Sequence, residues 1–510
     1  MRERNAAVLE VESSSKGLLP RAANGSRSAG GMGDGSERVS SGRVRRTAPL
    51  VGLTARTAGE AVVAGLRGKL AGEAGIDAEF YVRAAERYAD LLGRSKGALM
   101  KAGQMLSLVS VGPPVPSEFK SAYQTALARL REDAPPMTGE LALRVLEHEL
   151  GCQAQSVFAE FDCEPLAAAS IGQVHAARLH DGRAVAVKIQ YPGVADAVCA
   201  DLKNAELLTT FLGLMGAVSS RRLRLDLRGT AREMGVRITE ELDYRREAAN
   251  QAEFAACYRG HPFIRVPEVI AELSTGRVLT QELARGRTWS EALTAEQELR
   301  DQWGGAIYRF AYGSYHRFCL FNADPHPGNY VFHDDGSVSF LDFGCVKRLP
   351  RERIATMNEI MIACFRNDVR GTWRACVEAG LWRSSDPVTP EEVFAWWRHG
   401  SALWTEGRSV LSPAAVEAMV EHRYSPDSSA FNALQYLTMP PEFTMLGRME
   451  MAVAGVIAQL NAGIQWGALL AELFEDGSPL TAMGRRERAY FARPDRCAQL
   501  GASGIQHAQP

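Results

Sequence analysis

The chain has 510 residues, 46% hydrophobic and 23% charged, which is the composition of a soluble globular protein with two or three domains. A formal net charge of −2 gives no reason to expect a polyanion-binding surface, so no nucleic-acid partner is expected. The nine cysteines are scattered and form no C-x-x-C pair, which predicts that the protein has neither a zinc ribbon nor a disulfide framework. No apolar run is long enough to span a bilayer and no secretory signal is visible, so a cytoplasmic protein is expected.

The N-terminal part is expected to comprise a tail and a helical extension. Residues 1–50 are rich in Ser, Gly and Arg, cannot bury a core, and are predicted to be a disordered tail. Residues 51–138 show helical periodicity, most clearly at 84–92 and 96–109. Lys101 and Gln104 are three residues apart in the second helix and share one face, which by itself is typical of a solvated surface.

Residues 139–285 are predicted to form a lobe built on a small sheet. A short helix over Gly139–Leu150 precedes strands at 157–161, 174–179 and Ala184–Gln190. Two more strands are expected at 266–271 and 276–282, and the residues from Glu282 to 286 look like a hinge between lobes.

An alanine-rich loop is predicted before the second of these strands. It has the frame of the kinase loop G-x-G-x-x-G-x-V, with Ala at the first two glycine positions. The candidate phosphate-binding residues of this frame are Ala167, Ala168, Ala169, Ser170, Gly172 and Val174. The alternative is that the alanines only begin a helix or pack under a strand.

Lys188 ends a V-A-V-K sequence that is close to the V-A-I-K of kinases. A lysine on a buried strand needs an acidic partner, although a lysine on an edge strand could reach solvent instead. A helix predicted over 226–258 carries the candidate acids Glu241, Asp243 and Glu247. Either Glu241 or Glu247 could be the partner, and the sequence leaves this open.

Residues 286–475 are predicted to form a mostly helical second lobe. A possible capping box at residues 294–297 begins a helix with Trp303, Ile307, Phe310 and Phe318 facing inward. After Gly344 the chain turns helical without a long activation segment, and the Met-rich residues 439–451 are expected to pack in the core. Residues 476–510 are expected to be a polar C-terminal tail.

The most informative stretch of the chain runs from residue 322 to residue 344. Asp324 and Asn329 lie at the two ends of a D-x-x-x-x-N loop, and Asp342 opens an Asp-Phe-Gly sequence. Between them lies a hairpin signalled by an Asp-Gly turn, and a hairpin brings its two ends together. Carboxylate and amide oxygens that converge are ligands suited to Mg²⁺.

Together these motifs resemble the AarF/UbiB family of atypical kinases. The family motifs K-x-G-Q, an Ala-rich loop, a strand lysine, E-x-D, D-x-x-x-x-N and D-F-G occur here in the family's order over about residues 90 to 350. The resemblance implies an α+β, bilobal protein-kinase-like fold with a helical C-lobe and an N-terminal helical extension. In the family that extension folds over the active site, which would bring Lys101 and Gln104 near Glu241 and Asp243 and block a protein substrate.

The resemblance also implies chemistry. Family members bind ATP with Mg²⁺ and support isoprenoid quinone or other lipid metabolism. By likeness, Lys188 contacts phosphate, Asn329 and Asp342 hold the metal, and Asp324 is the candidate base. An isoprenoid or quinone-like lipid is therefore an expected partner, and peripheral contact with a membrane is expected as well. Many bacterial members of the family carry C-terminal transmembrane helices that are not found here, which puts stable membrane anchorage and a role in ubiquinone synthesis in doubt.

Two other functional classes fit part of the pattern. A small-molecule phosphotransferase of the aminoglycoside or choline kinase type also uses a D-x-H-x-G-N loop, but the Ala-rich loop and the Lys101–Gln104 pair argue against it. A pseudokinase that binds nucleotide and acts as a scaffold would share every motif and differ only in turnover. The sequence does not name the acceptor or the oligomeric state.

Overall fold

The computed structural model describes residues 137–169, 171–196, 198, 239–240, 242–405, 407–424, 430–438, 440–474 and 479–496. All of them belong to the second of two units into which the chain divides, residues 39–510. The expected tail and almost all of the helical extension lie outside the described residues, as do four candidate site residues: Lys101, Gln104, Ser170 and Glu241. Expectations for these parts of the chain remain predictions.

Among the described residues, the first lobe has a four-stranded sheet with helix α5 against it. Strands β1 (Phe158–Ala169), β2 (Gly172–Leu179), β3 (Ala184–Gln190) and β5 (Val278–Glu282) pair in that order, each antiparallel to its neighbour. Helix α5 (Gly139–Leu150) has the predicted bounds, with the Thr138 side chain accepting a hydrogen bond at its start and Gly151 left-handed at φ 70° at its end. Residues from the sheet and α5 form one hydrophobic core.

Two features of this part of the chain differ from the predictions. Strand β1 is much longer than the expected 157–161 and includes the alanine-rich segment. The prediction of a strand at 266–271 is wrong. Strand β4 is only Ile264–Arg265, and it is followed by an isolated β-bridge between Val269 and Gln281 and by the 3-10 helix η2 (Ala271–Leu273). Pro267 lacks an N–H and so cannot continue a strand ladder.

The second lobe is organised around helix α11 (Gln297–Phe318), which is buried along most of its length. Trp303, Ile307, Phe310 and Phe318 face the core as predicted. The expected capping box at residues 294–297 is wrong: the capping box lies one helix earlier, at the start of α10 (Trp289–Leu293), and α11 has no side-chain cap.

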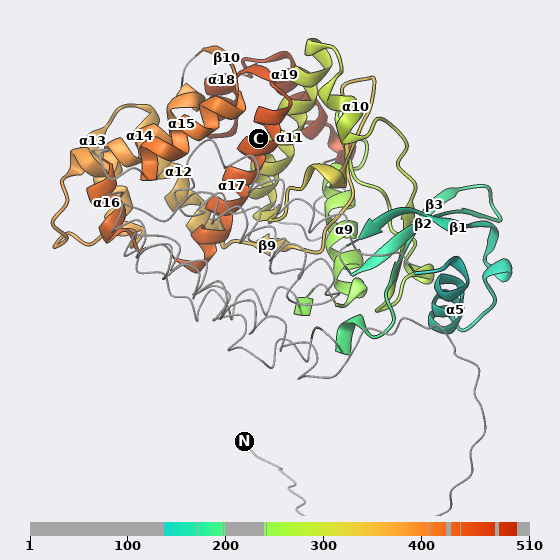
Figure 1. Cartoon of the computed structure of the whole chain (residues 1–510). Coiled ribbons are helices and arrows are strands. Elements are labelled where there is room, and N and C mark those ends of the chain that lie inside the picture. Colours follow the sequence, from blue (N-terminus) through green and yellow to red (C-terminus); the bar gives the residue numbers. More distant parts are fainter. Residues whose placement is uncertain are drawn as a thin grey trace, which may run out of the picture. The chain divides into compact units, whose positions relative to one another are not determined.

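Some of the other elements of this lobe lie against α11, and a group of helices lies farther from it (Figure 1). Its helices are α12 (Arg351–Phe365), α13 (Val369–Glu378), α14 (Pro390–Thr405), α15 (Pro413–Tyr424), α16 (Phe431–Tyr436), α17 (Pro441–Gln459), α18 (Trp466–Phe474) and α19 (Ala482–Phe491). Its short strands pair as β6 (Leu320–Asn322) with β9 (Val346–Arg348), β8 (Val338–Phe340) with both β7 (Tyr330–Phe332) and β4, and β10 (Arg408–Val410) with β11 (Gly463–Gln465). Met445 and Met449 lie in the core, as expected for the Met-rich segment.

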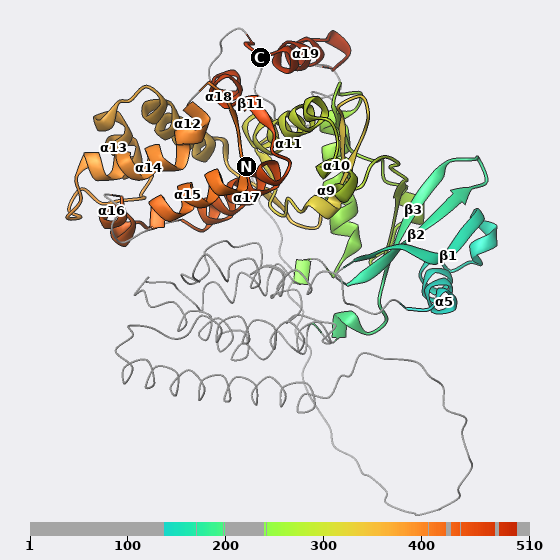
Figure 2. The same ribbon diagram turned by 45° about the horizontal axis from the view of Figure 1, so that its top comes forward.

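Helix α9 (Tyr244–Tyr258) belongs to both lobes. Tyr244, at its first turn, packs in the core of the sheet lobe, whereas Phe254 and Tyr258 pack in the core of the helical lobe. Both views show α9 between the sheet and the helices (Figures 1 and 2). The prediction of a single helix over 226–258 is wrong, because the backbone of Asp243 is extended (φ −116°, ψ 99°) and its side chain caps the start of α9. Two cores joined in this way confirm the expected bilobal α+β architecture.

The end of the chain differs from its prediction as a polar tail. Residues 479–496 include α19, and Tyr490 and Phe491 of that helix are buried in the core of the helical lobe. The helix is rich in arginine, with the sequence AMGRRERAYF, so its average polarity hides the buried face. In the part of the chain that the structure describes, no helix has the length and apolar character needed to cross a membrane.

Candidate functional site

Lys188 lies where the two lobes meet. It is on β3, between Val174 of β2 and Leu279 of β5. Its Nζ donates hydrogen bonds to both carboxylate oxygens of Glu247, at 2.8 and 2.9 Å, and to Oδ2 of Asp342 at 3.3 Å. Of the two candidate partners, Glu247 therefore pairs with Lys188, and Glu241 lies outside the described residues.

The charge of Lys188 is fixed by these neighbours. Burial alone lowers the pKa of the Lys188 amine, but the carboxylates of Asp342 and Glu247 outweigh it and raise that pKa well above its usual value. The amine also lies 5.0 Å from the centre of the Tyr244 ring, a favourable position for a cation. Lys188 is therefore a permanent cation, with 16% of its side chain exposed.

Hydrogen bonds fix both the side chain and the backbone of Asp342. Its Oδ1 accepts a hydrogen bond from the Gly344 N–H at 2.9 Å, and its backbone carbonyl accepts one from Asn322 Nδ2 at 2.6 Å. The same Asn322 side chain accepts the N–H of Asp324 through Oδ1 at 3.0 Å. Asn322 thus ties the start of the Asp324 loop directly to Asp342.

The other end of the loop is tied to the same place. The predicted hairpin forms as β7 and β8, with Gly336 left-handed at φ 78° in its turn. Beyond the hairpin, the Leu341 N–H donates to the Asn329 carbonyl at 3.0 Å. The loop residues Asp324 and Asn329 are therefore brought to Asp342, as the sequence predicted. His326 Nδ1 accepts from the Gly328 N–H at 3.0 Å, which shapes the loop itself.

The alanine-rich segment is a strand end. Ala167, Ala168 and Ala169 pair with Val174, Gln173 and Gly172, so β1 remains paired with β2 up to Ala169. The interpretation of these alanines as a helix start is wrong, because they are extended and paired.

Gly172 is needed for strand packing. A Cβ there would lie 2.3 Å from the Ile189 carbonyl oxygen and 3.0 Å from the Tyr244 hydroxyl. The glycine in this third position of the frame therefore lets β2 approach β3 closely.

Two other candidate acids make local structural contacts. Asp243 accepts a hydrogen bond from the Arg245 N–H and caps α9. Glu282, at the end of β5, accepts one from the Glu268 N–H at 3.1 Å. Neither contact involves Lys188 or the Asp324 loop.

The sequence reasoning missed residues that position the site through the backbone. Asn250 of α9 donates to the Phe343 carbonyl at 3.0 Å, and the Phe343 ring packs 4.8 Å from that of Phe254. Gln173 holds the backbone of Met137 by accepting its N–H and donating to its carbonyl, at 2.8 and 3.1 Å. Only Asn322 carried a local signal, since an Asn two residues before a turn often accepts a backbone N–H.

Comparison with known proteins agrees with these motifs. A sequence model of the ABC1 atypical kinase-like domain matches residues 129–375. The rat protein "Atypical kinase COQ8B, mitochondrial" is 35% identical over 270 residues, covering 52% of this chain and 49% of the relative. The Arabidopsis thaliana protein "ACTIVITY OF BC1 COMPLEX KINASE 8, chloroplastic" is 33% identical over 265 residues, covering 51% of this chain and 34% of the relative. The chain thus spans half or less of the length of these curated relatives.

A solved structure is similar over more of the chain. It is described as the complex of Rv3197 with erythromycin from Mycobacterium tuberculosis. It is 31% identical, with a TM-score of 0.56, and the match covers 74% of this chain and 92% of that one.

Proposed function

The chain belongs to the AarF/UbiB family of ABC1 atypical kinase-like proteins, and from this premise we propose that it binds ATP with Mg²⁺ and transfers the γ-phosphoryl group to water or to a small-molecule or lipid acceptor. One observation carries the proposal: Lys188 is held between Glu247 and Asp342, at 2.8 and 3.3 Å. A strand lysine paired with a helix glutamate, beside the acid of an Asp-Phe-Gly, is the arrangement that protein kinases require for phosphoryl transfer.

The residues of the site take distinct roles in this reaction. The Lys188 cation binds the α- and β-phosphates and is oriented by Glu247. The acceptor hydroxyl oxygen bonds to the γ-phosphorus while the bond from that phosphorus to the bridging oxygen breaks. ADP leaves with the electron pair of the broken bond, and the acceptor proton passes to Asp324, whose backbone Asn322 fixes.

The donor set suits a magnesium ion that arrives with its nucleotide. Asn329 and Asp342 would hold it through one amide and one carboxylate oxygen, which leaves its other positions to phosphate and water. Across the described ranges, no group of three or more His, Cys, Asp or Glu side chains could hold a metal ion by itself. When bound, the metal neutralises phosphate charge.

The flanking segments complete the proposed site. The hairpin end with Ala167, Ala168, Ala169, Ser170, Gly172 and Val174 would cover the phosphates. Lys101 and Gln104 of the extension would lie over the groove near Glu241 and Asp243, and would exclude protein substrates. Glu282 would mark the adenine side, since β5 ends there and leads into the hinge.

For the acceptor we propose an isoprenoid or quinone-like lipid met at a membrane surface by a cytoplasmic protein. The names of the relatives place two of them in mitochondria and chloroplasts. The likeness to the erythromycin complex favours a second candidate, a site for a macrolide-sized ligand that is coupled to nucleotide turnover. A pseudokinase scaffold and a phosphotransferase of the aminoglycoside or choline kinase type are the remaining alternatives.

A steady-state ATPase assay of the full chain separates these functions. Turnover with Mg²⁺ should rise with anionic-lipid vesicles and quinone-like phenols, and should be lost in Asp324→Asn. Asp334→Asn is the matched control, because Asp334 is 76% exposed in the hairpin turn and pairs with Arg287.

Each alternative has its own result in this assay. ATP binding with no turnover under any condition would favour the scaffold, and stimulation by erythromycin alone would favour the macrolide-sized ligand. Phosphorylation of an aminoglycoside or of choline would favour the phosphotransferase. Absence of nucleotide binding would overturn the proposal.

A further inference from the structure

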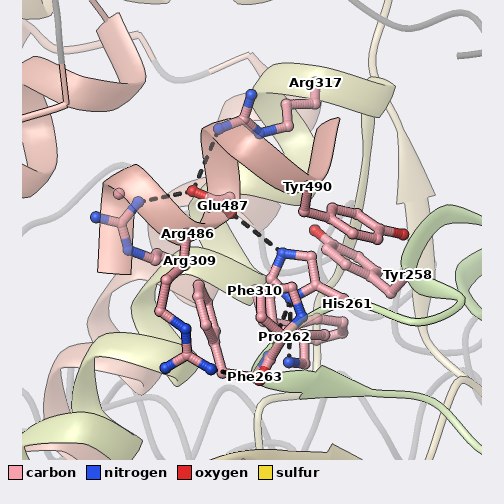
Figure 3. Close-up of polar contacts among 12 residues, drawn as sticks. Tyr258, His261, Pro262, Phe263, Arg309, Phe310, Arg317, Arg486, Glu487 and Tyr490 are labelled. Atoms are coloured by element: carbon pink, nitrogen blue, oxygen red, sulfur yellow. Dashed lines mark hydrogen bonds and ion pairs between the residues drawn. The ribbon is translucent and has the colours of Figure 1, made fainter. Parts of the chain in front are cut away.

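Helix α19, near the end of the chain, is attached by buried charges. The Glu487 side chain is 2% exposed, and its Oε2 accepts hydrogen bonds from Arg309 at 2.7 Å and from Arg317 at 3.3 Å, both on α11. The Arg309 guanidinium, 1% exposed, also donates to Glu472 of α18 and to the Thr481 hydroxyl. Figure 3 shows Glu487 facing Arg317 on one side and His261 on the other.

His261 extends this network to the turn after α9. Its Nδ1 accepts the Ile264 N–H at 3.1 Å, so its proton is on Nε2. That Nε2 faces Glu487 Oε1 at 3.7 Å, an electrostatic contact longer than a hydrogen bond. The ring of Tyr490 packs edge-on against His261, with centroids 4.8 Å apart. Glu487 therefore touches groups from both α11 and the α9–β4 turn.

Arg496 holds the end of α9 itself. Its guanidinium, in a side chain that is 2% exposed, donates to the carbonyls of Ala256 and Cys257, which belong to the last turn of α9. Those carbonyls have no partner within a helix, and a cation there also offsets the helix dipole. Tyr490 adds a hydrogen bond from its hydroxyl to the Arg259 carbonyl at 2.8 Å.

The other end of α9 is in the candidate site. Glu247 pairs with Lys188, and Asn250 holds the backbone of the Asp-Phe-Gly segment. Glu247 and Cys257 are ten residues apart on one helix, about 15 Å along its axis. Because a helix of this length moves as a rigid body, whatever fixes its C-terminal end also fixes Glu247.

We propose that residues 479–496, which we term the C-terminal clamp, position the nucleotide site by holding α9 against α11. Glu487 and Arg496 are positioning residues: they act on Lys188 through α9 and Glu247, and they touch no substrate. The expected effect on ATP affinity rests on the proposed function, whereas the expected effect on the position of α9 does not, since it exists without nucleotide. Buried ion pairs add little net stability compared with apolar packing, but they can define one arrangement.

The test compares hydrogen exchange and ATP affinity in full-length variants. Arg496→Met keeps the aliphatic stem and removes the contacts to α9, Arg496→Lys restores a cation there, and Arg488→Met is the control on the exposed face of α19. We expect Arg496→Met to speed ligand-free exchange at the turn with Glu247 and Asn250 and to weaken ATP binding, each by about three- to tenfold. Arg496→Lys should recover part of both effects, and Arg488→Met should match wild type.

A merely structural role predicts a different pattern. Loss of a cap frays only the last turn of a helix. Faster exchange confined to residues 255–258, with unchanged ATP affinity, would overturn the proposal. If Arg496→Met does not fold, Glu487→Gln, which keeps the shape of the side chain, gives the same two readouts. If wild type binds no ATP, the proposed function fails, and exchange at the Glu247 turn still decides whether the clamp acts on α9.

Discussion

The Lys188–Glu247 pair gives the sharpest prediction for stability. Lys188→Met removes the cation that donates to both Glu247 oxygens and leaves a carboxylate that is 5% exposed. Removing one partner of a buried pair in this way costs about 3–5 kcal/mol. Glu247→Gln should cost less, about 2 kcal/mol, because Asp342 still neutralises the lysine and the amide keeps one hydrogen bond to a charged group.

The double variant separates pairing from packing. Replacing both partners with apolar residues, as in Lys188→Met with Glu247→Leu, removes the uncompensated charge and should recover most of the loss. With Glu247→Leu alone as the matching single variant, the coupling energy should therefore be at least about 2 kcal/mol. Shifts in urea midpoint at unchanged slope, measured without nucleotide, give these values. Arg287→Met is the control, because its pair with Asp334 is 41% and 76% exposed and is worth at most about 1 kcal/mol. Additive losses would refute the inference that the two side chains stabilise each other.

Three further predictions address the metal, the loop and the effect of pH. Asp342→Asn should abolish the Mg²⁺-dependent part of the thermal shift by ATP, because the variant loses a charged ligand; a wild-type shift would contradict the metal assignment. Ala169→Gly should change ATP or ADP affinity by about tenfold, or about 1.4 kcal/mol. Gly172→Ala should instead lower the melting temperature, because its Cβ would lie 2.3 Å from the Ile189 carbonyl oxygen. Binding curves of Ala169→Gly and melting curves of Gly172→Ala that superimpose on those of wild type would show that neither position matters. Burial, with a smaller effect of Arg317, lowers the pKa of His316 in the folded protein from 6.5 to about 3. As pH falls below 6.5, His316 therefore binds a proton in the unfolded chain but not in the folded protein. Stability should then drop by about 2 kcal/mol between pH 7 and pH 5, less so in His316→Gln, and equal pH slopes in thermal melts would contradict this.

Much of the candidate site could be predicted because its chemistry is local in sequence. Lys188, the Asp324 loop, the hairpin and Asp342 lie in short motifs whose turns are encoded by Asp-Gly pairs and proline. The hairpin alone brings the acids of its two ends together. Lys101 and Gln104 carry no such local signal, and only the family resemblance singles them out.

The remaining features depend on contacts between distant segments. The sequence left both Glu241 and Glu247 open as partners of Lys188, whereas the structure begins α9 after the extended Asp243 and pairs Glu247 of that helix with Lys188. Polarity hid the packing of the C-terminal clamp, because Glu487 is buried against arginines of α11 and Arg496 against backbone carbonyls of α9. A hydrophobic pattern cannot reveal a core contact that is made of ion pairs.

Calorimetric titration of the full-length chain with Mg·ATP tests whether Lys188 belongs to a nucleotide site. We expect saturable binding at one site by wild type, weakened at least about tenfold, or about 1.4 kcal/mol, in Lys188→Met, and unchanged in the exposed control Arg287→Met. Equal affinity of Lys188→Met and wild type, or no binding by wild type, would contradict the claim that Lys188, Glu247 and Asp342 form a nucleotide site.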